Sequence, residues 1–133
     1  MAVRTGIYTK FTGDNTSTLY TLLGGTRLYY NEASQGPVHP YCVFRIFGET
    51  LDWTFDLEFE NVLVQFDYYS LTADDGDSGV AAIKLRYDYA ALANISNFTP
   101  IVMQRVDVMN ADKQQPSDVW LSIVRYELMM QKS

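Results

Sequence analysis

The chain has 133 residues, a formal net charge of −6 and a hydrophobic content of 47%. This length suffices for one domain with its own apolar core, without metals or disulfides to hold it together. The acidic balance repels phosphate groups, which argues against nucleic-acid binding as the main function. Cys42 is the single cysteine, and its place in an apolar run predicts a buried, reduced thiol.

Two N-terminal segments carry apolar residues at helical spacing. In the first segment these residues recur every four positions, at Val3, Ile7 and Phe11. The second segment has leucines three and four apart within Leu19–Leu23. Asp14 or Asn15 is expected to cap this second helix. Gly24 is expected to end it, because glycine tolerates the left-handed conformation found at helix ends.

The next part of the chain is predicted to be a short extended segment at 27–30, a loop at 31–40 and a strand at Tyr41–Phe47 that ends at Gly48. The loop holds His39, the only histidine. Residues three apart in an extended segment point to opposite faces, so His39 and Cys42 do not form a nucleophile pair. Enzymatic use of His39 is therefore not expected.

A central strand is predicted at 61–69, because apolar residues alternate there with mostly polar ones. The apolar side is formed by Val62, Val64, Phe66 and Tyr68. The opposite side carries Gln65 and Asp67, which we interpret as solvent-facing, as are the carboxylates of Glu58 and Glu60. The alternation changes phase upstream, and this predicts a turn or bulge near Glu60–Asn61.

Residues 71–79 are predicted to form an acidic loop before a helix at Val80–Asn94, with Asp77 or Ser78 as its N-cap. Three aspartates make this loop a candidate acidic surface toward a partner or a lumen, namely Asp74, Asp75 and Asp77. We expect the loop to be mobile and free of metal. A calcium loop that started at Asp75 would place Arg86 at its twelfth position, where a glutamate is required.

The predicted helix has two apolar stripes. The first stripe is expected to cover the sheet and contains Val80, Ile83, Tyr87, Ala90 and Ala91. The second stripe contains Ala82 and three larger residues, Leu85, Tyr89 and Leu92. These three are a candidate subunit interface, since a contiguous apolar patch is unusual in water. The alternative is that the leucines of the second N-terminal helix cover them, and both interpretations remain open.

Two further strands are predicted at 101–109 and 119–130, joined by a polar turn at 110–118. In the first of them, Val102, Val106 and Val108 are expected to share a face. The order of elements predicts one α+β domain over residues 1–133, with a mostly antiparallel sheet of about four to five strands packed against N-terminal helices and one central helix. No catalytic, cofactor-binding or metal constellation is apparent in the sequence.

Neither a signal peptide nor a membrane span is apparent, which predicts a soluble, cytoplasmic product. Apolar content, 10 tyrosines and no reactive group together favour a protein that makes contacts over an enzyme.

Three motifs resemble those of the tail-terminator, or tail-completion, proteins of long-tailed bacteriophages. They are the helix stop Leu22-Leu23-Gly24-Gly25-Thr26-Arg27, the loop with Gln35 that leads to the strand start Pro40-Tyr41-Cys42-Val43, and the strand Val62-Leu63-Val64-Gln65-Phe66-Asp67-Tyr68-Tyr69. A helix and a closing hairpin follow in the same order, so the resemblance covers nearly the whole chain.

The resemblance implies a non-catalytic virion protein of the phage tail. Such proteins form a homo-oligomeric ring, typically a hexamer, on the end of the tail tube. The ring stops polymerisation of the tail tube protein and gives the surface for the head-tail connector protein. Two alternatives stay open, which are a neck or head-completion connector protein and, more distantly, a small ligand-binding module or enzyme.

Overall fold

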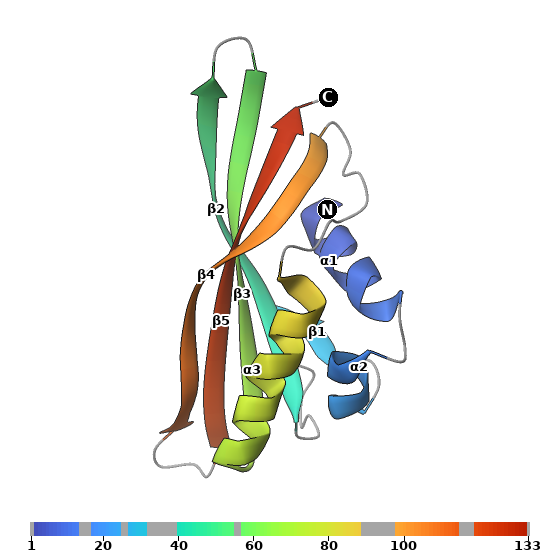
Figure 1. Ribbon diagram of the computed structural model, residues 1–133, viewed down its shortest axis with the longest axis vertical. Coiled ribbons are helices and arrows are strands. Elements are labelled where there is room, and N and C mark those ends of the chain that lie inside the picture. The colour runs from blue at the N-terminus through green and yellow to red at the C-terminus, as the bar shows by residue number, and fades with distance from the viewer. Residues whose placement is uncertain are drawn as a thin grey trace.

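The computed structural model describes most of the chain, namely residues 2–13, 17–24, 27–31, 40–54, 57–88, 98–114 and 119–132. Within these residues, three helices lie on one face of a five-stranded sheet (Figure 1). In chain order the elements are α1 (Ala2–Thr12), α2 (Thr18–Leu22), β1 (Leu28–Tyr30), β2 (Tyr41–Thr54), β3 (Leu57–Ser70), α3 (Ala73–Tyr87), β4 (Phe98–Gln114) and β5 (Val119–Lys132). The predicted α+β class, with N-terminal helices and one central helix, is confirmed.

The strands lie in the order β1-β2-β3-β5-β4, so β3 is the middle strand of the sheet. This confirms the central position predicted from its alternating residues. β2, β3, β5 and β4 pair antiparallel, whereas β1 pairs parallel with the start of β2. The sheet is strongly twisted, and the β2–β3 hairpin extends past the helices at one end (Figure 1).

The bulge predicted near Glu60–Asn61 is wrong in its position. β3 is one continuous strand from Leu57 to Ser70, and the irregularity lies in its partner β2, between Phe47 and Glu49. β2 also continues through Gly48 to Thr54, although Gly48 was expected to end it. The extra residue in β2 is left out of the pairing, which keeps the hairpin in register on both sides of the bulge.

The core lies between the helices and one face of the sheet. The predicted apolar side of β3 is confirmed, because Val62, Val64, Phe66 and Tyr68 are all buried. The first stripe of α3 packs against it through Val80, Ile83 and Tyr87, also buried. Ile7, Phe11, Leu19 and Leu23 from α1 and α2 complete this core. Ala90 and Ala91 lie outside the described residues.

α3 begins earlier than predicted. Its N-cap is Thr72, whose hydroxyl accepts a hydrogen bond from the backbone amide of Asp75 at 3.1 Å. Most of the segment expected to be an acidic loop, with Asp77 or Ser78 as the cap, therefore belongs to the first turns of the helix. Asp74 and Asp75 lie in its first turn, where carboxylates interact favourably with the positive end of the helix dipole. Gly79, inside the helix, lies directly over the ring of Tyr68.

The N-terminal helices are joined to α3 by side chains that reach their backbone. The Tyr87 hydroxyl donates a buried hydrogen bond to the carbonyl of Ile7 at 3.0 Å, and Arg86 donates to the carbonyl of Lys10. Ser17, rather than Asp14 or Asn15, caps α2, and the two predicted caps lie outside the described residues. Gly24 has the expected left-handed conformation, with φ of 67°.

β4 continues to Gln114, past the predicted end at 109, and its pairing with β5 shifts register at three places. One shift lies between Arg105 and Asp107, and it changes which residues share a face. Val108 consequently packs against the core, while Val106 is 55% exposed. The expectation that these two valines share a face is therefore wrong.

Candidate functional site

The sheet has a second face, opposite the helices, which we call the open face. Alternation along β2, β3, β4 and β5 places about every second residue on it. Several of these residues are large and apolar, and three of them, Phe47, Leu63 and Met109, are 44%, 41% and 37% exposed. An antiparallel sheet that shows one face to water usually carries polar residues there, so exposed apolar groups mark this face as a candidate contact surface.

A chain of polar side chains crosses the open face from β2 to β4. Arg45 Nη1 lies 3.2 Å from Asp67 Oδ2, and the Gln65 side-chain amide donates to Asp67 Oδ1 at 2.7 Å. On the other side, Arg125 Nε donates to Gln65 Oε1 at 3.0 Å. Arg125 Nη1 also lies 3.5 Å from Asp107 Oδ2. Four neighbouring strands are thus linked through five side chains with balanced charge.

The burial of Asp67 corrects the expectation that its side chain and that of Gln65 face solvent. The Asp67 side chain is only 3% exposed, and Gln65 is also buried. A carboxylate that has lost its water needs charge-assisted partners, which Arg45 and Gln65 supply. The side chains of Glu58 and Glu60 lie outside the described residues. The sequence around Asp67 does not predict this burial, because its partner Arg45 comes from another strand.

Three tyrosines gather at one end of the open face. The rings of Tyr41 and Tyr69 are stacked with centroids 4.9 Å apart, and Tyr29 meets Tyr41 edge-on at 6.3 Å. Burial, and secondarily the negative charge of Asp67, raise the pKa of Tyr69, while Arg45 acts in the opposite direction. The aromatic cluster therefore connects with the polar chain and extends the open face as a surface rich in contact-forming residues.

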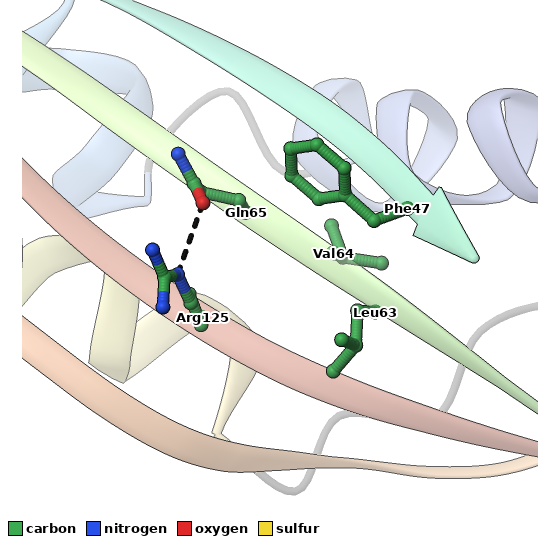
Figure 2. A pocket seen from close by; sticks show the side chains of 5 residues that line it. All are labelled: Phe47, Leu63, Val64, Gln65 and Arg125. Atoms are coloured by element: carbon green, nitrogen blue, oxygen red, sulfur yellow. Dashed lines mark hydrogen bonds between the residues drawn. The ribbon is translucent and has the colours of Figure 1, made fainter.

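Two shallow hollows lie on this surface. The larger, of about 260 Å³, has Phe47, Leu63 and Arg125 around it, with Gln65 beside Arg125 (Figure 2). The second, of about 220 Å³, lies beyond Arg125 and is lined by Met109 and Ile123 among others. Arg125 lines both hollows, together with apolar side chains. Such shallow, mixed surfaces suit side chains of a protein partner better than an enclosed small molecule.

The candidate interface on α3 is described only in part. Leu85 is 76% exposed, so the leucines of α2 do not cover it. Leu19 and Leu23 are buried in the core instead, and Leu85 borders a depression shared with α2. Tyr89 and Leu92 lie outside the described residues, and their role as interface residues stays a prediction.

The three predicted acidic residues lie on the first turns of α3. Asp74 and Asp77 are exposed, whereas Asp75 accepts a hydrogen bond from the Tyr68 hydroxyl at 3.2 Å. Since they belong to a helix, the expectation of a mobile loop is wrong. Across the described part of the chain, no three or more potential ligands among His, Cys, Asp and Glu come together to hold a metal ion.

Cys42 is a free, buried thiol, which confirms that expectation from the sequence. Burial, followed by the nearby charge of Asp67, raises the pKa of this thiol well above its ordinary value. It therefore stays protonated and is a poor nucleophile. His39 lies outside the described residues. No described helix has the length and apolar character needed to cross a bilayer.

The sequence matches no protein-family model and no curated protein. The fold, in contrast, is similar to that of a chain in a solved structure described as the virion of a native gene transfer agent particle. The likeness has a TM-score of 0.75 and covers 98% of this chain and 95% of the other, at 14% sequence identity. At this low identity the likeness shows only that the two chains share a fold, over nearly their whole length.

Proposed function

We propose that this chain is a structural component of a phage-like virion, and that it serves as the tail terminator. The observation that carries the proposal is the end-to-end likeness in fold to a chain of a gene transfer agent virion. The sequence resemblance to tail-terminator proteins supports the finer role. In this role a ring of copies, typically six in the family, sits on the end of the tail tube, stops its growth and receives the head-tail connector protein.

The surface of the chain suits this role. The open face offers exposed apolar groups next to a stable polar chain, and Leu85 offers a second exposed apolar group on the opposite side of the molecule. A subunit of a ring needs two such contact surfaces. The net charge of −6 repels DNA, so a ring of these chains lets DNA pass without binding it.

A non-catalytic role follows from the same proposal. Cys42 is buried and protonated, and we expect the variants His39→Ala and Cys42→Ala to support particle assembly as the wild type does. If either variant folds normally, as judged by circular dichroism, and yet fails in assembly, the residue has a role beyond structure and this part of the proposal is wrong.

The main test is to delete the gene and examine the particles by electron microscopy. Loss of a tail terminator leaves tubes of irregular, excessive length without heads attached. Loss of a neck or head-completion connector instead leaves tails of normal length and separate heads, and this outcome would favour the alternative. Absence of the chain from purified particles by mass spectrometry, with normal particles after deletion, would contradict both roles.

A further inference from the structure

We infer that the outer side of α3 in one copy of the chain docks onto the open face of the sheet in the next copy. The inference rests on the proposed ring and names the two surfaces that meet in it. On α3 the contact surface is the line Asp77, Ala81 and Leu85, which we call the helix stripe. On the sheet it is the larger hollow between Phe47 and Leu63 and the arginines beside it.

The helix stripe is a row of side chains on the helix surface, inclined by about 26° to the helix axis. Its three residues are four apart, so their side chains lie one above the other, about 6 Å from one to the next. All three are exposed, and Leu85 is the most exposed of the large apolar residues described, at 76%. Ala81 is small and lets another backbone approach the middle of the row. The stripe therefore has an apolar end at Leu85, a small side chain at Ala81 in the middle and an acidic end at Asp77.

The open face has the matching sequence of features. Phe47 and Leu63 pair across β2 and β3 and form the apolar row. Arg45 and Arg125 flank Gln65 in the next row, about 7 Å further along the strands. With Leu85 placed in the hollow, Ala81 lies over the row of Gln65. Asp77 then comes within reach of the long arginine side chains.

A second pair of charges fits the same arrangement. Glu127 pairs with Leu63 across β5 and β3, so it lies at the apolar end of the sheet surface. Lys84 precedes Leu85 in sequence and lies beside it at the apolar end of the helix stripe. Docking thus brings a lysine to a glutamate at one end and an aspartate to arginines at the other. Both surfaces belong to this chain, so a second copy satisfies both pairs of charges.

This contact joins two different surfaces of the subunit, which makes it heterologous. Such contacts repeat from copy to copy and form a closed ring when the rotation between subunits closes. Pairing of two open faces with each other would instead give a symmetric dimer and would leave Leu85 in water. The two arrangements are therefore distinguished by whether Leu85 is needed.

The test measures the mass of purified chains in solution by light scattering, over concentrations up to the solubility limit. We expect the wild type to self-associate and the variants Leu85→Asp and Leu63→Lys each to lose association while they keep their circular dichroism and melting behaviour. Both positions are exposed, so neither charge has to enter the core. Val106→Asp is the matched control, since Val106 is an exposed apolar residue of β4 that belongs neither to the helix stripe nor to the larger hollow, and it should associate like the wild type.

Mixing the two variants gives the sharpest result. In an equimolar mixture, the carboxylate introduced by Leu85→Asp in one chain meets the ammonium group introduced by Leu63→Lys in the other, so association should return at least in part. Failure of two folded variants to associate on mixing would overturn the inference. So would association of Leu85→Asp alone, which would point to pairing of open faces, or a wild type that stays monomeric. These outcomes concern the pure chain, so they are separate from the deletion experiment that tests the role in the virion.

Discussion

A methyl group added to Gly79 would lie 2.4 Å from Cε1 of Tyr68, so α3 and β3 approach as closely as they do only because this helical residue has no side chain. Alanine normally stabilises a helix relative to glycine by about 0.5–1 kcal/mol. Here the ring of Tyr68 is fully buried and bonded to Asp75, so it has little room to move.

We therefore expect Gly79→Ala to lower the free energy of unfolding by about 1–3 kcal/mol, the usual cost of overpacking. Chemical denaturation followed by circular dichroism measures the change. The neighbouring substitution Ser78→Ala, at an exposed position, is the control and should be neutral or slightly stabilising. A Gly79→Ala chain as stable as the control would show that the helix shifts away at no cost.

The polar chain on the open face gives a second prediction. Asp67→Ala removes the acceptor of both Arg45 and Gln65, and we expect a loss of about 1–3 kcal/mol in unfolding free energy. The exposure of Arg45, at 40%, keeps the loss below that of a fully buried pair. Asp107→Ala is the matched control, because Asp107 is 55% exposed and 3.5 Å from Arg125, and its effect should stay within about 0.5 kcal/mol. Equal effects of the two substitutions would contradict the structural role of Asp67.

The third prediction concerns alkaline pH. Burial raises the pKa of Tyr68, Tyr87 and Tyr126 well above the ordinary value of 10.0. The folded chain therefore keeps these protons at a pH where the unfolded chain releases them. The contribution of these tyrosines to stability is constant below about pH 10 and falls as the pH rises above it, by up to about 1.4 kcal/mol per pH unit for each tyrosine.

Denaturation curves between neutral and strongly alkaline pH measure this fall. The variant Tyr87→Phe lacks one of the ionising tyrosines, so above about pH 10 its unfolding free energy should fall less steeply with pH than that of the wild type. The variant also loses the hydrogen bond to Ile7. The comparison uses slopes and not absolute stabilities, so the lost hydrogen bond does not obscure it. An unchanged slope would mean that Tyr87 ionises equally in both states.

The fourth prediction is that the acidic turn of α3 does not bind calcium or magnesium tightly. Asp75 already accepts a hydrogen bond from the Tyr68 hydroxyl. Asp74 and Asp77 lie on a regular helix, which does not bring their carboxylates together around one ion. Titration calorimetry with either ion should show no tight site. Sub-micromolar binding that disappears in Asp74→Asn would refute this view of the turn.

Patterns within one element were sufficient to predict much of the fold. The alternation in β3 and the first stripe of α3 identified the core, because burial on one face leaves a period that can be read locally. The start of α3 was missed for a physical reason. Two glycines, Gly76 and Gly79, disfavour a helix on propensity, and the packing against Tyr68 that compensates for Gly79 is tertiary.

Features that depend on partners far away in the sequence were beyond such patterns. The phase change in β3 was assigned to a bulge in that strand, yet its partner β2 carries the irregularity. The alternation in β3 predicts a solvent-facing Asp67, since nothing near it in sequence shows that Arg45, from another strand, pairs with it. The exposure of Leu85 likewise depends on where α2 packs. The sequence identifies Leu85 as a candidate interface residue, but it does not show whether α2 covers it.

The order of the strands has a consequence for how the chain folds. β2 and β3, like β4 and β5, are neighbours in sequence and pair as hairpins, whereas β3 and β5 pair across most of the second half of the chain. Hairpins form early, because closing a short loop costs little conformational entropy. Strands that are distant in sequence pair later. We therefore expect the union of the two hairpins along β3 and β5 to be the slow step of folding. Until it is complete, each hairpin has an unpaired edge at which chains can aggregate when their concentration is high.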